Sequence, residues 1–506
     1  MYLTRQGIGL SFARAAAPSL AHPAFWPALA LLAVYVGSYL GFAAQLISFP
    51  FDLDQGEGYD AWSGWLINLG QMPYGDNASF PYYSHGYPPL WSYLVSIPLA
   101  WGTPALASAR TVSTLAALLA TLVLGLAARR RAGSAAAGLL AGAFFLGSPY
   151  VFHTTPLARV NGTTLLVELL ALWLLEISTR TRTLAASVVL VAALFTKPTA
   201  VDAVAAGILF LALGQPRRAV IAGGLVATLG LTVLAALQMA TRGAYAVNVL
   251  VSNTSPFLLG QLVAYASNVV LLHPVILALA AAEVVQALRH RPRALSPWHL
   301  YAVTATLLAL ATVGKSGAGE SYFLGALAAA SMLAAVQVDR LVRAWRRQWP
   351  PRPALAYGLA VALLAQCLLL AHGALSDALP WLPDRGLQAA SLGRAPTAAD
   401  RRAGEEIVGL MRGVQGPVLA EDASFAVAAG KPLVGGTPPS LRNLYQAGAW
   451  DPSPLVADLH AHRFGMVVLN AQLYPEPVLA AIGQAYFQVR TVQVNNAEYR
   501  VFLPGS

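Results

Sequence analysis

Charged side chains are scarce in this sequence. Only 11% of the 506 residues are Asp, Glu, Lys or Arg, whereas about a quarter are charged in a typical soluble domain. Hydrophobic residues make up 57% of the chain and the mean hydropathy is +0.58. These values exclude a soluble enzyme for most of the chain, and they exclude a disordered protein, which has low hydrophobicity and high charge. They predict an α-helical polytopic membrane protein.

Cysteine and lysine are also rare. Cys367 is the single cysteine, so neither an intrachain disulfide nor a cysteine-based metal cluster can form. Three lysines stand against 29 arginines, and together with abundant Ala, Leu and Gly this ratio indicates a GC-rich, bacterial genome. The net charge of +10 is explained below by membrane orientation, so we expect no nucleic-acid partner.

Long apolar stretches predict about eleven transmembrane helices, since a crossing takes about 20 apolar residues. Lys197-Pro198 either separates two short helices within 183–213 or kinks one long helix. The stretches are 27–49, 104–127, 133–150, 160–178, 183–196, 199–213, 219–240, 262–288, 298–313, 322–338 and 354–373.

The basic residues between these stretches predict the orientation, because cytoplasmic loops carry the excess of Lys and Arg. The predicted outer side holds Arg110, Arg159, Lys197, Arg242 and Lys315. We therefore expect a plasma-membrane protein with a cytoplasmic N-terminus and everything after 374 outside the cytoplasm. The predicted cytoplasmic side holds Arg5, Arg14, Arg129, Arg130, Arg131, Arg180, Arg182, Arg217, Arg218, Arg289, Arg291, Arg293, Arg340, Arg343, Arg346, Arg347 and Arg352.

The first predicted external loop, residues 50–103, concentrates acidic residues. Asp52, Asp54, Glu57 and Asp60 lie within nine residues, and such crowding raises carboxyl pKa values or recruits a cation. Either outcome suits function, as a general base or as an oxygen-rich metal site. Helical spacing from Glu57 onward predicts an amphipathic helix in the membrane interface, with carboxylates on its polar side. A solvated loop rich in turn residues is the alternative.

Further polar residues gather at the external ends of the predicted helices. Charged groups at membrane depth are costly and commonly functional, although simple extension of side chains toward water also explains such positions. We predict that these cations and histidine bind a phosphate whose lipid tail stays in the bilayer. They are His85, Arg159, Lys197 and Lys315. The residues expected to contact the substrate are Asp60, Tyr87, Glu320 and Tyr322.

The chain changes character after the last apolar stretch. Residues 1–374 form the predicted membrane domain, 375–393 a linker, and 394–506 a small α/β domain outside the cytoplasm. Strands are expected near 417–421, 464–469, 487–493 and 497–502, with helices between them, so a mostly parallel sheet is predicted. We expect Glu421-Asp422 to cap the helix that follows.

Four passages carry a family resemblance: Asp54-Gln-Gly-Glu-Gly58 with Gly70-Gln-Met-Pro-Tyr74, Tyr87-Pro-Pro89, Leu194-Phe-Thr-Lys-Pro198, and Gly317-Ala-Gly-Glu-Ser-Tyr-Phe323. With the hydropathy pattern and the external C-terminal domain, they resemble GT-C integral-membrane glycosyltransferases. The nearer branch is family 39, the protein O-mannosyltransferases and the lipid A aminoarabinose transferase. The Trp-Trp-Asp signature of oligosaccharyltransferases is absent.

The resemblance implies inverting transfer of a sugar from a polyprenyl-phosphate donor to an envelope glycan, lipid or protein on the outer face. It implies a base from the first loop, often part of an Asp-Glu pair. Here Gly56 precedes Glu57, so the base is either Asp54 or Glu57. The same two residues are the candidates for a divalent metal such as Mg or Mn, which would assist the reaction if bound. A transporter or flippase of a lipid-linked or anionic substrate, and a catalytically silent glycan- or lipid-binding scaffold, are the alternatives.

Overall fold

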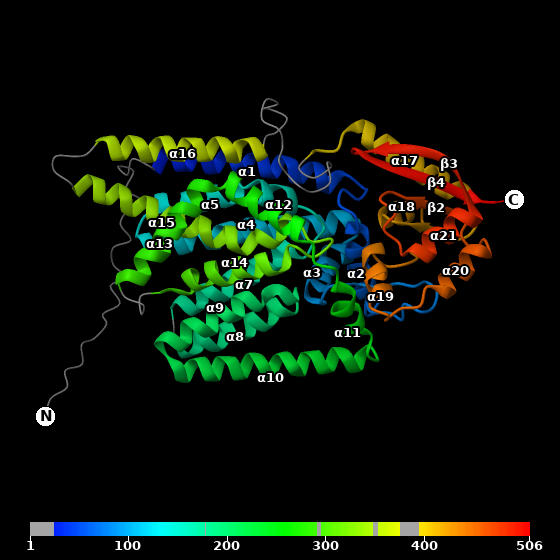
Figure 1. Cartoon of the computed structure of the whole chain (residues 1–506), viewed down its shortest axis with the longest axis horizontal. Helices are drawn as coiled ribbons and strands as arrows, with labels where there is room; N and C mark the ends of the chain where they lie inside the picture. Colours follow the sequence, from blue (N-terminus) through cyan, green and yellow to red (C-terminus); the bar gives the residue numbers. More distant parts are fainter. Residues whose placement is uncertain (1–24, 178, 291–294, 348–352, 375–393, 506) are drawn as a thin grey trace.

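The computed structural model describes residues 25–177, 179–290, 295–347, 353–374 and 394–505. Helices fill the membrane domain, and the C-terminal domain lies beyond one end of them (Figure 1). The α-helices are α1 (Phe25–Ser48), α2 (Glu57–Asn68), α3 (Leu90–Ala100), α4 (Ala105–Ala132), α5 (Ala135–Leu146), α6 (Pro149–Thr154), α7 (Asn161–Glu176), α8 (Arg180–Leu194), α9 (Val201–Gly214), α10 (Pro216–Ala240), α11 (Ala244–Val249), α12 (Leu259–Leu272), α13 (Pro274–His290), α14 (Pro297–Thr312), α15 (Leu324–Arg347) and α16 (Pro353–Ala374). Three 3₁₀ helices accompany them: η1 (Pro198–Ala200), η2 (Val251–Asn253) and η4 (Glu320–Phe323).

A helix occupies each of the predicted apolar stretches, and the polytopic helical class is confirmed. Among the described residues, four helices, namely α1, α4, α10 and the η4–α15 unit Glu320–Arg347, are long and apolar enough by themselves to cross a membrane. The count of eleven crossings stays a prediction, since several of the other helices are shorter than a crossing requires.

Two stretches differ in detail from simple spans. The stretch predicted at 262–288 is not one straight helix, because α12 and α13 meet at an angle of 88° around His273 and Pro274. Proline at the start of α13 cannot donate the backbone hydrogen bond that would continue α12. Lys197-Pro198 does separate two helices, α8 and α9, rather than kinking one.

Large apolar side chains cover the outside of the bundle. On α10, Val220 and Met239 are each 75% exposed, and on α16 Tyr357 is 72% exposed. Helix α15 instead lies in the interior, where it packs against α4, α5, α13 and α14. Apolar surface of this extent is typical of helices that face lipid, where burial against protein is not needed.

The C-terminal domain contains four strands: β1 (Val418–Ala420), β2 (Met466–Leu469), β3 (Tyr486–Val494) and β4 (Ala497–Pro504). Its helices are α17 (Ala398–Gly413), α18 (Ala423–Ala428), α19 (Pro438–Gln446), α20 (Ser453–His460) and α21 (Glu476–Ala485). The strand order is β1-β2-β4-β3, and only β1 and β2 are parallel. The predicted mostly parallel sheet is therefore wrong, since β3 and β4 form a hairpin through Asn495 and Asn496 whose second strand joins β2. The predicted linker 375–393 lies outside the described residues.

Glu421 does not cap the helix that follows it. Its carboxylate accepts backbone hydrogen bonds from Asn470, Ala471, Gln472 and Leu473, and so it organises the turn after β2. Asp422 is the residue before α18, but it makes no side-chain cap, and its carboxylate accepts a hydrogen bond of 2.6 Å from the Tyr499 hydroxyl. The predicted helix cap is therefore wrong at both positions.

The C-terminal domain packs directly on the first loop. Asp52 and Ser424 exchange two hydrogen bonds of 2.9 Å, one through the Asp52 carboxylate and one through the Ser424 hydroxyl. The Tyr59 hydroxyl donates to the Ala420 carbonyl at 2.8 Å, and the rings of Phe51 and Phe425 stack with centroids 5.0 Å apart. These contacts bury the first half of α2, so its carboxylates do not lie over an open membrane surface as predicted. The solvated-loop alternative is excluded for the same reason.

Candidate active site

The loop before α2 turns sharply at Gly56, which has a φ of +93°. A Cβ atom there would lie 2.9 Å from Cγ2 of Thr437 and 3.3 Å from Nη1 of Arg159. Both the left-handed backbone and the close approach therefore require glycine. This explains why an acidic residue does not precede Glu57, because no side chain fits at the position.

Glu57 lies at the start of α2 and is fully buried. Its carboxylate is paired with the guanidinium of Arg110, with Oε1 3.0 Å from Nε and Oε2 2.8 Å from Nη2. It also accepts backbone hydrogen bonds from Leu53, Asp54 and Ala158. Burial by itself raises the pKa of a carboxyl group, but the charge and hydrogen bonds of Arg110 and the backbone donors lower the pKa of Glu57 to about 2.

Arg110 ties this carboxylate to the membrane helices. Its remaining hydrogen bonds go to the carbonyl oxygens of Leu46, Phe49 and Phe51, at the end of α1 and the start of the loop. The pair thus joins the loop to α4 and to the C-terminal end of α1. Both oxygens of Glu57 are occupied, so the carboxylate is placed to hold the loop rather than to accept a substrate proton.

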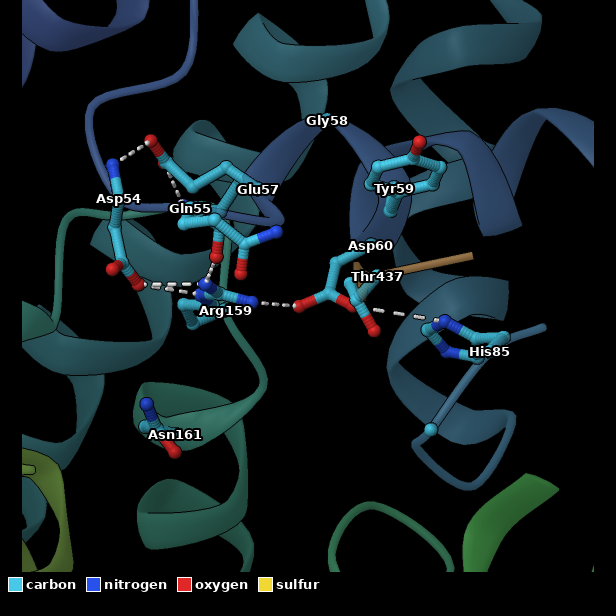
Figure 2. A network of polar contacts seen from close by, with 12 residues as sticks. Asp54, Gln55, Glu57, Gly58, Tyr59, Asp60, His85, Arg159, Asn161 and Thr437 are labelled. Carbon is cyan, nitrogen blue, oxygen red and sulfur yellow. Dashed lines mark hydrogen bonds and ion pairs between the residues drawn. The ribbon is translucent and has the colours of Figure 1, made fainter. Parts of the chain in front are cut away.

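Arg159, between α6 and α7, is the centre of a second network (Figure 2). Its guanidinium contacts Oδ2 of Asp54 at 2.9 Å from Nε and 2.7 Å from Nη2. Its Nη1 contacts Oδ2 of Asp60 at 2.6 Å, and Nη2 donates to the Gln55 carbonyl. One arginine therefore orients the carboxylates of both Asp54 and Asp60. Because its charge is balanced by two carboxylates, Arg159 is less suited than predicted to bind a phosphate.

Asp54 is accessible, whereas the neighbouring carboxylates of Asp52, Glu57 and Asp60 are buried. Its side chain is 30% exposed, and Oδ1 has no hydrogen-bond partner in the described part of the chain. In Figure 2 this oxygen points away from Arg159, whereas Oδ2 faces it. Asp54 thus combines a fixed orientation with one free acceptor atom.

Asp60 lies between Arg159 and His85, and both partners are largely buried. Burial raises the pKa of Asp60 to about 6, although Arg159 opposes the shift. Nδ1 of His85 is 3.7 Å from Oδ1 of Asp60. Burial, together with the charge of Arg159, lowers the pKa of His85 to about 3. The imidazole is therefore neutral near pH 7 and does not supply the phosphate-binding cation that the sequence suggested.

A cavity of about 560 Å³ opens beside these residues. Of the sequence-predicted site residues, Asp54, Asp60, Tyr87, Arg159, Lys197, Lys315 and Tyr322 line it. Thr437, Ser440, Arg442 and Asn443 of the C-terminal domain also line the cavity, and so does Leu473. The site therefore lies between the two domains.

Lys197 reaches the cavity from the break between α8 and α9. Its Nζ donates to Oδ1 of Asn161 at 2.9 Å and lies 4.6 Å from the centre of the Tyr322 ring. These partners are uncharged, so the ammonium keeps its capacity for an anion, and the ring face favours a cation above it. The passages around Lys197 and Tyr322, far apart in the sequence, meet here.

Glu320, predicted to contact substrate, does not line the cavity. It is fully buried, and its Oε2 lies 3.0 Å from Nδ1 of His153 on α6. Its neighbours Gly319 and Ser321 do face the cavity. Successive side chains of a 3₁₀ helix point in different directions around its axis, about three residues per turn, and that of Glu320 points to α6, so it fixes η4 against α6.

The pair of carboxylates considered for a metal does not form an open site. Glu57 is bound by Arg110 and Asp54 is bound through one oxygen by Arg159. Across the described residues, no group of three or more His, Cys, Asp or Glu side chains could hold a metal ion. The donor set therefore suits arginine pairing better than cation coordination.

Sequence reasoning missed Arg442 and the other C-terminal residues of the cavity. Arg442 follows Thr437-Pro-Pro in a passage that predicts only the start of a helix. Its sequence gives no sign that α19 packs beside η2, where Asn443 donates to the Ser252 carbonyl at 2.8 Å. Asn161 carried a weak signal, as a polar residue at a predicted helix end.

No protein-family model matches the chain, and no curated protein matches it. Several solved structures, in contrast, are similar to the chain. ArnT from Cupriavidus metallidurans bound to undecaprenyl phosphate is 14% identical, with a TM-score of 0.57 over 94% of this chain and 98% of that one. ArnT in the apo state gives a TM-score of 0.58 at 13% identity, over 94% of this chain and 97% of that one. The archaeal oligosaccharyltransferase AglB from Archaeoglobus fulgidus, in complex with an inhibitory peptide and a dolichol-phosphate, is 14% identical with a TM-score of 0.51, over 92% of this chain and 73% of that one.

These similarities confirm the fold expected from the sequence. The chain has the architecture of GT-C glycosyltransferases, with a helical membrane domain and a smaller C-terminal domain. The likeness extends over almost the whole length of both this chain and ArnT. At 12–14% identity it shows the fold alone.

Proposed function

We propose that the protein transfers a sugar from a polyprenyl-phosphate donor to an acceptor hydroxyl at the outer face of the membrane. The observation that carries the proposal is the cavity between the two domains. It brings the free Oδ1 of Asp54 together with the ammonium groups of Lys197 and Lys315. The structural neighbours bind undecaprenyl phosphate and dolichol-phosphate, which supports a donor of this class.

Asp54 is the proposed general base. The acceptor oxygen attacks the anomeric carbon while Oδ1 of Asp54 takes the hydroxyl proton. The bond from that carbon to the phosphate oxygen breaks, and the leaving phosphate keeps the electron pair. A single displacement of this kind inverts the anomeric configuration. A positioned base contributes typically about 10²–10⁴-fold to the rate.

The cations have the complementary role. Negative charge develops on the leaving phosphate, and preorganised cations in a water-poor site stabilise such charge strongly. Lys197 and Lys315 supply that charge. Arg159 orients Asp54 and Asp60, and Glu57 with Arg110 fixes the loop beneath them. Tyr87 and Tyr322 offer aromatic surface to the sugar. The donor lipid, an envelope glycan, lipid or protein acceptor, and the surrounding membrane lipids are the proposed partners.

The proposal is tested with the purified protein, a panel of radiolabelled polyprenyl-phosphate sugars and an envelope fraction as acceptor. Asp54→Asn is compared with Asp76→Asn, since Asp76 is an exposed aspartate of the same loop that does not line this cavity. We expect transfer by the wild type and by Asp76→Asn, and a loss of at least about 100-fold in Asp54→Asn.

Melting curves of all three proteins show whether each is folded. Transfer that is unaffected by Asp54→Asn would contradict the assignment of the base. No transfer from any donor by a folded wild type that binds one of them would contradict the proposed reaction and favour a binding protein.

A further inference from the structure

Two cations that line the cavity have no counter-charge. Neither Lys315 nor Arg442 makes a side-chain hydrogen bond or ion pair with any other residue that the structure describes. Arg159, in contrast, is bonded to both carboxylates of the cavity lining, Asp54 and Asp60. The cavity therefore has one neutralised side and one side with two unpaired positive charges.

Both unpaired cations come from backbone that is anchored to the same segment, residues 252–261. On the Lys315 side, Leu258 N–H donates to the Gly314 carbonyl at 2.7 Å and Ser316 N–H to the Pro256 carbonyl at 2.9 Å. On the Arg442 side, the adjacent Asn443 donates from Nδ2 to the Ser252 carbonyl at 2.8 Å. Lys315 thus comes from the membrane domain and Arg442 from the C-terminal domain, and the chain beside each is bonded to the same connection.

Serine hydroxyls also line the cavity. The hydroxyls of Ser255 and Ser316 line it, and neither is bonded to another described side chain. No carboxylate among the described lining residues faces these groups without already being paired to Arg159. Two cations with hydroxyl donors at a domain junction are the chemistry that recognises phosphate, since arginine offers a planar fork and lysine a point charge.

We infer that Lys315 and Arg442 form an anion subsite that binds a phosphate group, and that the C-terminal domain completes it. The inference rests on the proposed function and deepens it, because it makes the C-terminal domain a contributor to the site rather than a cover. The phosphate belongs either to the polyprenyl donor or to a phosphorylated acceptor. Lys197, which donates to Asn161 and lines the same cavity, remains available for the other partner.

The experiment measures binding of undecaprenyl phosphate and, separately, of inorganic phosphate to the full-length protein in nanodiscs. The variants are Arg442→Gln and Lys315→Gln, with Arg442→Lys as a charge-preserving variant. Arg402→Gln is the matched control, since Arg402 is an exposed arginine of the same domain that does not line the cavity. Melting temperatures establish that each variant is folded.

We expect the Kd for undecaprenyl phosphate to rise at least tenfold in Arg442→Gln and in Lys315→Gln. Arg442→Lys restores part of the affinity, and Arg402→Gln leaves it unchanged. If only inorganic phosphate binding is lost, the subsite stands and serves a phosphorylated acceptor. If folded Arg442→Gln and Lys315→Gln bind both probes as the wild type does, the subsite is wrong.

The result is separable from that of the transfer assay. Phosphate binding that depends on Arg442, together with an absence of transfer from every donor, would keep the subsite and reject the glycosyltransferase reaction. Transfer that depends on Asp54, with phosphate binding indifferent to Arg442 and Lys315, would keep the reaction and reject the subsite.

Discussion

The guanidinium of Arg159 holds Asp54 through one carboxylate oxygen only, with Nε and Nη2 at 2.9 and 2.7 Å from Oδ2. The other oxygen is left for the cavity (Figure 2). An arginine that also binds Asp60 cannot rotate toward Asp54 alone, so the direction of the free oxygen is set by both ion pairs. This relationship fixes the orientation of the proposed base.

Replacing Arg159 by lysine tests this orientation. Lysine offers a point charge and cannot bridge two carboxylates with a fixed fork. We expect Arg159→Lys to lower kcat at least tenfold with a smaller effect on donor KM, because Asp54 loses its alignment while the phosphate-binding cations stay in place. Arg402→Lys, at an exposed position, is the control, and equal kcat values for the two variants would contradict the role of Arg159.

The buried pair of Glu57 and Arg110 is expected to matter for stability. Removing one partner of a fully buried ion pair leaves an uncompensated charge, which costs about 3–5 kcal/mol. Glu57→Gln should therefore lower the unfolding free energy by about that amount, measured by denaturation in detergent. Glu405→Gln, at an exposed glutamate of α17, should have no measurable effect.

A double variant separates the charge from the packing. Glu57→Gln combined with Arg110→Met removes both charges, so we expect it to be less destabilised than Glu57→Gln alone. Equal destabilisation of the single and double variants would mean that the hydrogen bonds of Arg110 to the backbone, rather than the ion pair, hold the loop.

The pH dependence follows from Asp60. Its pKa is raised from the ordinary 3.8 to about 6, so the folded protein binds a proton here at pH values where the unfolded chain does not. The contribution of Asp60 to stability therefore falls as the pH rises through about 6. Activity is expected to rise with pH instead, because protonation of Asp60 removes a charged partner of Arg159.

We expect kcat of the wild type to decline below about pH 6. In Asp60→Asn we expect this acid limb of the pH–rate profile to disappear and the maximal kcat to be lower. A pH–rate profile of both proteins measures the effect. An unchanged acid limb in Asp60→Asn would assign it to another group.

Gly56 is predicted to tolerate no side chain. Alanine would adopt a left-handed backbone and bring its Cβ within 2.9 Å of Thr437. We expect Gly56→Ala to destabilise the protein by about 1–3 kcal/mol, the cost of strained backbone, and to lower transfer by displacing Asp54. Gly70→Ala, which shares the positive φ of +71° but meets no atom within 4 Å, is the control for the backbone effect alone. Similar losses in both would show that contact with the C-terminal domain is unimportant.

Transfer is expected to proceed without a divalent metal. In the proposed site Lys197 and Lys315 supply the charge near the leaving phosphate, while Arg110 pairs with Glu57 and Arg159 engages one oxygen of Asp54. Dialysis against EDTA should leave the rate within about twofold of the untreated enzyme. A loss that Mg²⁺ or Mn²⁺ restores would show that a metal joins Asp54 in the substrate complex.

The sequence by itself determined the membrane class, eleven apolar stretches that are helical, and the acidic first loop, because hydropathy and charge are local properties of the chain. It did not reveal α3, an apolar helix of 11 residues within the predicted loop. It also singled out Asp54, Lys197, Lys315 and Tyr322, which line the cavity, since polar groups at helix ends stand out against an apolar background. It could not separate Asp54 from Glu57, which differ only in what surrounds them.

Tertiary structure alone decided those roles. Arg110 lies 53 residues after Glu57 and Arg159 lies 105 residues after Asp54, and their pairing makes Glu57 a buried anchor and leaves Asp54 accessible. Folding likewise buried His85 and turned Glu320 away from the cavity, and it brought Arg442 of the C-terminal domain into it. Burial and charge pairing depend on which distant segments pack together, and the spacing of residues along the amino-acid sequence does not contain that information.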